Sequence, residues 1–496
     1  MRKTLYIFSL FVLSLCFAAC TSHPDVPSAA KSVGKLPQIY PDYCNVTVPC
    51  NIAPLNFMLP NEVYDECVAR ITTPDGNSQT YGDGHKVIIP EDEWHDILAA
   101  SSGKDITVEV WGKKGNEWYA FNKFNITVSA DSIDEYISYR LIEPSYLIYD
   151  YMEIAQRNIS NFEESTIFNN KVACDKAKGQ CINCHSYQNY RTDNMLFHVR
   201  VTNGGTIFVN DGELSKVNLK RDNTISAGVY PSWHPTEKLV AFSTNTTRQM
   251  MHTINKNKAE IFDLASDLIL YDITKDEVSI VSADTTRLEV FPTWSPDGKY
   301  LYYCSTLSDT TKANISSNYR NVQYNLYRRA FDVKTHQFGD EELIYDAVSK
   351  NRSISLPRVS PDGHHIIFAE SGYGCFNIWH HDADIQMIDI PTTTSSENMN
   401  QTNSLSLLNS KDYAESYPTW SSNGKWIMCA SRRDDGNYSR VYISYFDGKK
   451  AHKAFELPQS DPEHNSLRLK SYNRPEFMVE PVKHTISEFK NVVEKE

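Results

Sequence analysis

The 496-residue sequence predicts an all-β protein in which a small β-sandwich precedes a β-propeller. Three observations support this fold class. The composition has 29 Tyr and 21 Phe against only 20 Gly, which favours strands. Residues 39–130 contain segments in which apolar and polar residues alternate. From residue 229 onward a hairpin pattern recurs about every 60 residues, a period typical of propeller blades.

The N-terminus, MRKTLYIFSLFVLSLCFAAC, has the pattern of a secretory signal. Two basic residues precede an apolar run that is shorter than the roughly 20 residues needed to span a bilayer. Its last four residues resemble a bacterial lipobox, with Phe in place of the usual Leu. We therefore expect a lipoprotein signal peptide at residues 1–19, a lipid on Cys20 and a flexible tether at 20–38. Cleavage without lipid attachment is the alternative.

This signal predicts where the protein resides. A lipid on the first mature residue would hold the chain in the cell envelope, and we expect the outer membrane, with the body facing the periplasm.

Residues 39–130 predict the sandwich. The segments NVTVPCNIAPLNFML, DITVEVWGKKGNEWYAF and FNKFNITVSA are alternating strands with polar turns, which is typical of an immunoglobulin-like domain. The segment KVIIPEDEWHDILAA adds a short capped helix. Residues 131–180 carry five tyrosines in mixed periodicity, and we interpret them as a connector that packs on the propeller.

Four later segments share one pattern. Each has an aromatic residue or Leu, then Pro, then an aromatic residue or Val two positions on, followed by a polar turn and an apolar strand. The prolines are Pro231, Pro292, Pro357 and Pro418, with a weaker copy at Pro475. In SPDGKY and SPDGHH, Asp-Gly supplies the left-handed position of a hairpin turn. A second alternating strand follows in most units, so each unit contains the four strands of a blade; unrelated hairpins in a sandwich are the alternative.

The segments WSPDGK and LYDI resemble the WD40-like repeats of the TolB family of periplasmic propellers, over about residues 185–480. The resemblance implies six blades. We place the propeller at 181–484 and a C-terminal tail at 485–496, and we expect the segment around Pro475 to close the ring.

The segment GQCINCHSYQ contains Cys181, Cys184 and His185 in a Cys-x-x-Cys-His pattern. Two thiols three positions apart reach the two vinyl groups of a haem, and the next residue presents its imidazole to the iron. Bacteria attach this haem outside the cytoplasm, which agrees with the export signal. We therefore expect one covalent haem c, and the chain then resembles haem-bearing TolB-like lipoproteins of the Bacteroidetes type.

Two other interpretations of the motif stay open. A thioredoxin-type redox pair would follow a strand and open a helix, whereas these surroundings are rich in strands. A zinc site would recruit Cys174 as a fourth ligand, but His185 directly after Cys184 is awkward for one tetrahedral ion.

The motif also aligns with the repeats. His185-Ser186-Tyr187 falls where Pro231-Ser232-Trp233 falls, which places the motif in the loop leading into the first blade.

The sixth iron ligand has several candidates. Met195 lies ten residues after His185 and would raise the reduction potential, although a core methionine is the alternative. His198 is the rival, and strand alternation puts the two on opposite faces. Met250 to His252 lie in a polar stretch and form a third possibility.

The remaining cysteines and histidines suggest structural roles. Cys304 and Cys429 lie in apolar strand patterns and are interpreted as buried thiols. Cys44 and Cys50 are close enough in sequence to pair. The His380-His381 pair is interpreted as a solvated blade edge.

Charge and motifs narrow the function. The net charge of −13 without basic runs argues against nucleic acid as a partner. No catalytic triad, phosphate loop or paired-carboxylate motif stands out, so whether the chain is an enzyme is left open. We favour electron transfer or redox-linked binding with a redox or envelope protein partner. The alternatives are a peroxidase-like haem enzyme and a binding propeller whose haem is structural or sensory.

Overall fold

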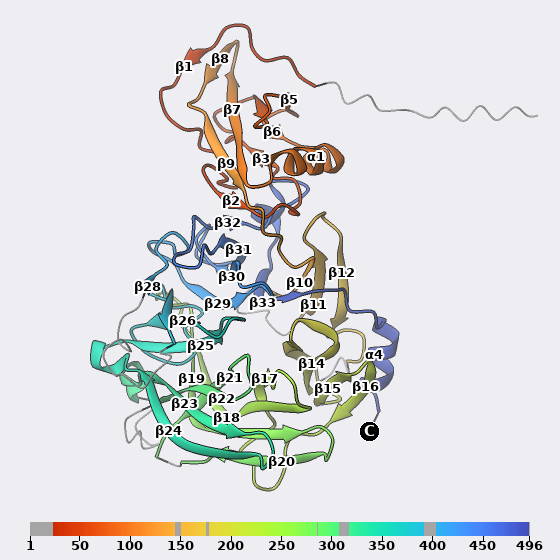
Figure 1. The fold of residues 1–496 in the computed structure, drawn as a ribbon, viewed down its shortest axis with the longest axis vertical. Helices are drawn as coiled ribbons and strands as arrows, with labels where there is room; N and C mark the ends of the chain where they lie inside the picture. The colour runs from red at the N-terminus through yellow and green to blue at the C-terminus, as the bar shows by residue number, and fades with distance from the viewer. Residues whose placement is uncertain are drawn as a thin grey trace, which may run out of the picture.

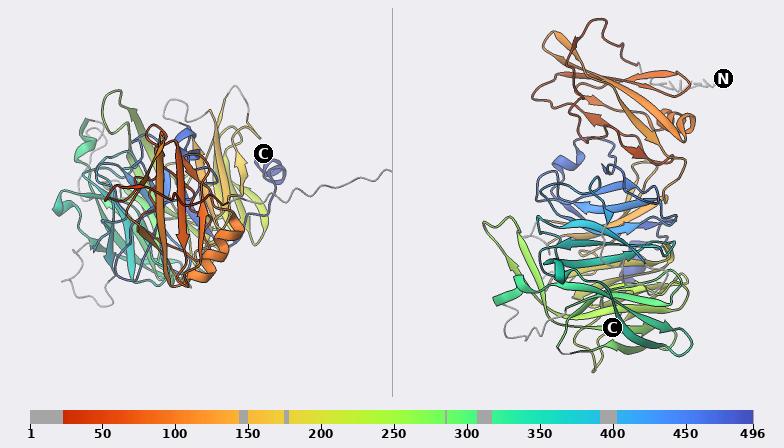
Figure 2. Two further views of the ribbon diagram at one scale, coloured as in Figure 1. Left: turned by 90° about the horizontal axis from the view of Figure 1, so that it is seen from above. Right: turned by 60° about the vertical axis from the view of Figure 1, so that its left-hand side comes forward.

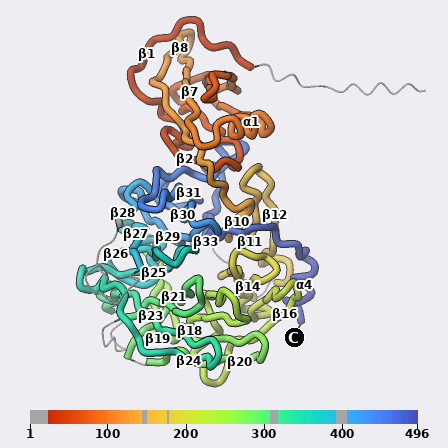
Figure 3. Tube along the Cα trace, in the orientation of Figure 1, coloured from red at the N-terminus to blue at the C-terminus, as the bar shows by residue number. Residues whose placement is uncertain are grey.

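The computed structural model describes residues 23–143, 150–174, 178–284, 286–306, 317–390 and 403–495. A small N-terminal domain sits on the rim of a ring of sheets, as Figure 1 shows. The right-hand view of Figure 2 shows the two bodies stacked end to end, and Figure 3 traces the chain through them. Strands dominate both bodies, which confirms the all-β class.

The N-terminal domain is built on one seven-stranded sheet. Its strands are β1 (Lys31–Ser32), β2 (Thr47–Val48), β4 (Glu66–Thr72), β5 (Ser78–Tyr81), β7 (Lys104–Lys114), β8 (Glu117–Ala120) and β9 (Phe124–Val128). Beside it lie a two-stranded sheet, β3 (Phe57–Met58) with β6 (Lys86–Val87), and helix α1 (Glu91–Ser101).

This arrangement differs from a sandwich of two similar sheets. The long strand β7 pairs with β4 along one edge and with both β9 and β8 along the other, which keeps these strands in a single sheet. Helix α1 forms as expected, but Pro90 at its N-cap has no side-chain cap. Its Trp94 is fully buried and donates to the carbonyl of Ile52.

The rest of the described chain forms six four-stranded sheets. Three of them are β13 (Gln180–Gln188), β14 (Arg191–Val201), β15 (Gly205–Asn210), β16 (Glu213–Val217); β17 (Val229–Trp233), β18 (Leu239–Met251), β19 (Ala259–Asp272), β20 (Glu277–Ser282); and β21 (Glu289–Trp294), β22 (Tyr300–Thr306), β23 (Tyr324–Asp332), β24 (Gln337–Tyr345). Two more are β25 (Ser353–Val359), β26 (His365–Ser371), β27 (Asp384–Asp389), β28 (Asn403–Ser404); and β29 (Glu415–Trp420), β30 (Trp426–Ser431), β31 (Arg440–Tyr445), β32 (Phe455–Glu456).

The sixth sheet closes the ring with strands from both ends of the chain. It contains β10 (Tyr136–Ile142), β11 (Met152–Asn158), β12 (Glu164–Asn169) and the late strand β33 (Ser471–Met478). β33 pairs with β10, so the segment around Pro475 closes the ring as expected. Residues 131–180 are therefore not only a connector: three of their strands belong to a sheet of the ring, because the C-terminal strand supplies the fourth.

Short helical elements complete the described chain: α3 (His464–Leu467), α4 (Ile486–Val493) and the 3₁₀ turns Tyr319–Asn321 and Val348–Lys350. Residues 485–496, expected to be a C-terminal tail, include α4, which begins with a capping box at Thr485 and buries Phe489 against Phe168 and Phe197.

The turn motif of the repeats has a clear physical basis. In SPDGKY, the hydroxyl of Ser295 donates to Asp297, which accepts from the Lys299 amide. Gly298 follows with φ at +70°, and a Cβ there would lie 2.4 Å from the His234 ring. Only glycine suits this position, since both the backbone conformation and the available space exclude a side chain. The expected turn chemistry is confirmed.

Candidate functional site

The Cys-x-x-Cys-His motif lies in β13, the innermost strand of its sheet. The expectation of a loop at this point is wrong, because residues of β13 pair with β14 on both sides of the motif. The pairing is interrupted between Asn183 and Ser186, so Cys184 and His185 form a bulge. At this bulge Cys184 has a left-handed backbone, with φ at +57°.

The same left-handed position recurs on the other five innermost strands, at Tyr230, Phe291, Leu356, Tyr417 and Arg474. Each is followed directly by the repeat proline, and His185 takes the proline's place in β13. The alignment of the motif with the repeats is therefore confirmed. Non-glycine residues rarely adopt this conformation, and here it recurs at the equivalent position of each of the six innermost strands.

Cys181, Cys184 and His185 line one cavity of about 450 Å³. Their exposed fractions are only 7%, 8% and 0%. Neither ring nitrogen of His185 has a hydrogen-bond partner of good geometry, which is rare for a buried polar group. Burial, helped by the positive charges of Arg474 and Arg140, lowers the pKa of His185 well below its ordinary value. The imidazole is therefore neutral and has a free lone pair.

The cavity walls combine cations with aromatic rings. The cations are Arg140, Arg200, Arg432 and Arg474, and the rings are Tyr230, Phe376, Trp379 and Tyr417. These residues come from several sheets and meet only because the ring brings the sheets together. Burial raises the pKa of the Cys181 thiol, while the nearby charges of Arg140 and Arg200 oppose this effect.

Two segments cover the cavity, and we call them the roof: the β18–β19 hairpin (residues 247–262) and the segment between β26 and β27 (372–383). Met251, Ala259 and Ile261 of the hairpin line the cavity, as do Phe376 and Trp379 of the second segment.

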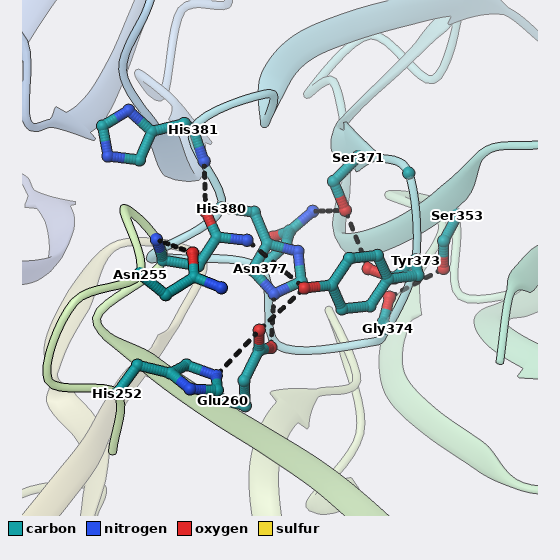
Figure 4. Close-up of polar contacts among 12 residues, drawn as sticks. His252, Asn255, Glu260, Ser353, Ser371, Tyr373, Gly374, Asn377, His380 and His381 are labelled. Atoms are coloured by element: carbon teal, nitrogen blue, oxygen red, sulfur yellow. Dashed lines mark hydrogen bonds and ion pairs between the residues drawn. The ribbon is translucent and has the colours of Figure 1, made fainter. Parts of the chain in front are cut away.

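A buried carboxylate joins the two roof segments. Figure 4 shows Glu260 between His380 and Tyr373, which donate to its two oxygens at 2.8 Å and 2.7 Å. His252 approaches the same carboxylate at 3.6 Å. Burial raises the pKa of Glu260, but the hydrogen bonds from His380 and Tyr373 outweigh this and hold it below its ordinary value. His380 is only 1% exposed, so its interpretation as a solvated edge is wrong.

The cavity continues along the ring axis. A narrow passage of about 30 Å³ shares Tyr230, Tyr417 and Arg474 with the cavity. Beyond it lies a second cavity of about 420 Å³, which shares Arg358 with the passage. Three hollows thus lie in a row through the ring, with the motif beside the first.

The candidates for the sixth ligand lie in different places. Met195 is fully buried in an apolar cluster with Phe197 and does not line the cavity. His198 lies on the other face of β14, as alternation predicted, where its Nδ1 is 2.9 Å from the Thr206 hydroxyl. Met251 of the roof lines the cavity, and so does Met152 of β11.

The other cysteines match their predictions in part. Cys304 and Cys429 are free and fully buried, as expected. Cys44 and Cys50 are both free, so the suggested pairing is wrong. Among the described residues, no group of three or more His, Cys, Asp or Glu side chains could hold a metal ion.

The expected lipidation site, Cys20, lies outside the described residues, and so does the expected signal peptide. Within the part of the chain that the structure describes, no helix is long and apolar enough to cross a membrane.

No protein-family model matches the chain, and no curated protein does either. Solved structures share its general shape at low similarity. The Niastella koreensis GH74 enzyme has a TM-score of 0.37 and 10% identity, over 64% of this chain and 44% of that one. A puromycin-hydrolyzing peptidase of Mycobacterium tuberculosis gives 0.36 and 10%, over 72% and 52%. The β-propeller domain of Myceliophteria thermophila Cps50 (Swd1) gives 0.30 and 10%, over 56% and 86%.

This chain therefore spans about half or less of the length of the first two structures. At these scores the comparisons carry no argument about function. The description of the ring rests on its own strand pairing.

Sequence reasoning did not find the arginines of the cavity. Arg474 did carry a signal, because it occupies the position before proline where four other repeats have an aromatic residue or Leu. Arg140 and Arg432 follow no repeat pattern, and only the closed ring shows that they face the motif.

Proposed function

We propose that this protein is an exported, lipid-anchored c-type cytochrome whose single haem occupies the cavity beside β13. One observation carries the proposal: two cysteines and a histidine from one strand line the same cavity, and neither ring nitrogen of the buried His185 has a hydrogen-bond partner of good geometry. Cys181 and Cys184 would hold the porphyrin through thioethers, and His185 would coordinate the iron. When bound, the haem supplies one-electron redox chemistry.

The surroundings support an electron carrier. The roof covers the cavity, and aromatic side chains such as Trp379 and Tyr417 form much of its wall. Such walls exclude water and favour a stable environment for one-electron exchange with a partner protein of the envelope. The proposed role is electron transfer or redox-linked binding.

The sixth ligand that fits the cavity best is Met251 of the roof. Of the candidate ligands that the sequence suggested, Met251 lines the cavity, whereas Met195 and His198 pack elsewhere. A thioether ligand would fill the open axial position and favour electron transfer over peroxide chemistry.

A second candidate function is ligand binding by the propeller channel, with haem in a structural or sensory role. The second cavity, of about 420 Å³, supports it: Ser232, Thr293, Thr419 and the Arg358–Glu476 ion pair line it. Polar groups converging on a hollow are typical of small-molecule sites.

The test is covalent attachment. Protein matured with the export and haem-attachment machinery should be red and should keep its haem through acid-acetone extraction. Replacing both Cys181 and Cys184 by Ala should abolish that retention, whereas Cys50→Ala, a half-buried thiol of the N-terminal domain, should not. A colourless protein with stoichiometric zinc would refute the proposal.

A further inference from the structure

The cavity beside β13 carries an excess of positive charge. Four arginines line it, and Glu143 is the single acid among its described lining residues. Arg200 is exposed at the mouth, but the other three are largely inside. Buried cations are stable in proteins when an anion compensates them.

Among the described residues, no carboxylate accepts a hydrogen bond from Arg432, although the negative charge of Asp435 acts on it without direct contact. Arg432 is 5% exposed, and its guanidinium donates only to backbone carbonyls, those of Ile378 and Asn437. Its plane stacks on Trp379, with 3.4 Å between the guanidinium carbon and the ring centre. Burial lowers its pKa to about 9, and the charges of Tyr417 and Asp435 offset this lowering only in part. The Arg432 guanidinium therefore lies at the cavity wall with its charge compensated only in part.

Arg140 and Arg474 are half-buried, and their charges are also compensated only in part. Arg140 makes one long hydrogen bond, 3.5 Å to the Ile182 carbonyl, and its Nε is buried without a partner. Arg474 lies 3.4 Å from Glu476, but that carboxylate also pairs with Arg358. One carboxylate therefore serves two guanidinium groups.

These three arginines converge on one region. The hydroxyl of Tyr417, which lines the cavity, lies within the field of Arg140, Arg474 and Arg432: burial raises its pKa to about 12, and the three charges oppose the rise. Arg474 and Arg140 also act on His185. The cations therefore surround the part of the cavity that the motif faces.

We infer that Arg140, Arg432 and Arg474 form a carboxylate-binding cluster for the ligand of this cavity. This inference rests on the proposed function in its preferred form, where the carboxylates are the two propionates of the haem. A free dicarboxylate has the same recognition chemistry, because guanidinium groups bind carboxylates through paired hydrogen bonds. The three arginines would orient the ligand by binding its carboxylates, while the motif on β13 would hold the opposite side of the ligand.

The test compares ligands with and without charged carboxylates. The full-length chain carrying Cys181→Ala and Cys184→Ala, purified without haem, is titrated with haem, with haem dimethyl ester and with succinate. We expect haem to bind about tenfold or more tightly than the ester, since each charge-assisted hydrogen bond contributes strongly. Arg432→Gln and Arg140→Gln should each remove most of that preference and leave the affinity for the ester unchanged. Arg191→Gln, an exposed arginine paired with Asp193, is the matched control.

The outcomes separate the two proposals. If succinate binds in an arginine-dependent way while neither porphyrin binds, the cluster stands and the haem assignment falls. If haem and its ester bind equally, or if both variants keep the preference, the cluster is refuted even when the mature protein carries covalent haem. If none of the three ligands binds, the cluster is refuted as well. If Arg432→Gln fails to fold, Arg140→Gln alone tests the cluster.

Discussion

Cys184 in β13 and Arg474 in β33 occupy equivalent left-handed positions on two neighbouring innermost strands, with φ at +57° and +49°. These are the strands that meet where the ring closes. Burial lowers the pKa of Arg474, and electrostatic interactions with Cys184 and Glu476 outweigh this and raise it, which shows that the side chains of Cys184 and Arg474 lie close together. The closure of the ring therefore joins the cysteine motif to the cationic wall of the cavity.

The left-handed backbone at Cys184 predicts an unusual order of substitutions. In protein produced without haem, Cys184→Gly should leave stability nearly unchanged, because glycine adopts positive φ without strain. Cys184→Val should cost about 1–3 kcal/mol, since a β-branched side chain is strained there. Urea unfolding of the two variants measures the difference. Equal stability, or a more stable Val variant, would contradict the bulge.

Part of the fold was predictable because its determinants are local. Each repeat has a proline followed by a polar turn, and in SPDGKY and SPDGHH the Asp-Gly pair predicts a left-handed turn position; these local features place the innermost strands correctly. The pairing of β10 with β33 was not predictable in the same way, because it joins residues more than 300 positions apart. Nothing near Tyr136 indicates that its partner strand lies at the far end of the chain.

The candidate site shows the same limit. The spacing of Cys181, Cys184 and His185 is local and indicated their chemistry. Strand alternation predicted that Met195 and His198 lie on opposite faces of β14. It could not predict that neither of these side chains lines the cavity. That fact depends on which sheets pack beside β14.

The sixth-ligand assignment leads to a paired prediction. Met195 is fully buried beside Phe197, so Met195→Ala should lower the free energy of unfolding by about 2–5 kcal/mol and leave the haem spectrum unchanged. Met251→Ala should change the haem from low spin to high spin with little loss of stability, since Met251 is 38% exposed. Visible spectra and unfolding curves of the two variants show which methionine is the iron ligand. High-spin features in the Met195 variant would restore Met195 as the ligand.

The lipid anchor is tested by Cys20→Ser. The variant should move from the membrane fraction to the soluble periplasmic fraction, because this single residue is expected to carry all the acyl chains. Fractionation followed by immunoblotting measures the shift. A variant that stays with the membranes would show that another anchor exists.

Glu289 of β21 predicts a loss of stability as the pH rises from acidic to neutral values. It is 1% exposed, one of its oxygens has no partner, and burial raises its pKa to about 7. The folded state thus holds this proton more tightly than the unfolded state, so stability falls as pH rises from about 4.5 through 7. Glu289→Gln should remove the effect and gain roughly 2–3 kcal/mol at pH 8, with little change at pH 4. The exposed Glu277→Gln is the control, and an unchanged pH profile would contradict the prediction.

The roof should open when Glu260 loses its charge. Its hydrogen bonds with His380 and Tyr373 connect the β18–β19 hairpin to the segment between β26 and β27. Glu260→Gln should weaken this connection by about 1.5–3 kcal/mol, the value of a hydrogen bond to a charged group. Amide exchange in residues 247–262 and 372–383 should then accelerate, whereas Tyr373→Phe, which removes one bond, should have a smaller effect.

The pH dependence of the roof has the opposite sign to that of Glu289. The pKa of Glu260 is lower in the folded protein than in the unfolded chain, where it is about 4.5. The stability that Glu260 gives the roof is therefore fully present above pH 4.5, and it is lost as the pH falls through the lower pKa of the folded state. The wild-type roof should therefore exchange faster at strongly acidic pH, while Glu260→Gln should show no such acceleration. Hydrogen exchange measured across this range, with the helix α4 as an internal reference, tests the claim. If wild type and Glu260→Gln exchange alike at neutral pH, Glu260 does not hold the roof over the cavity.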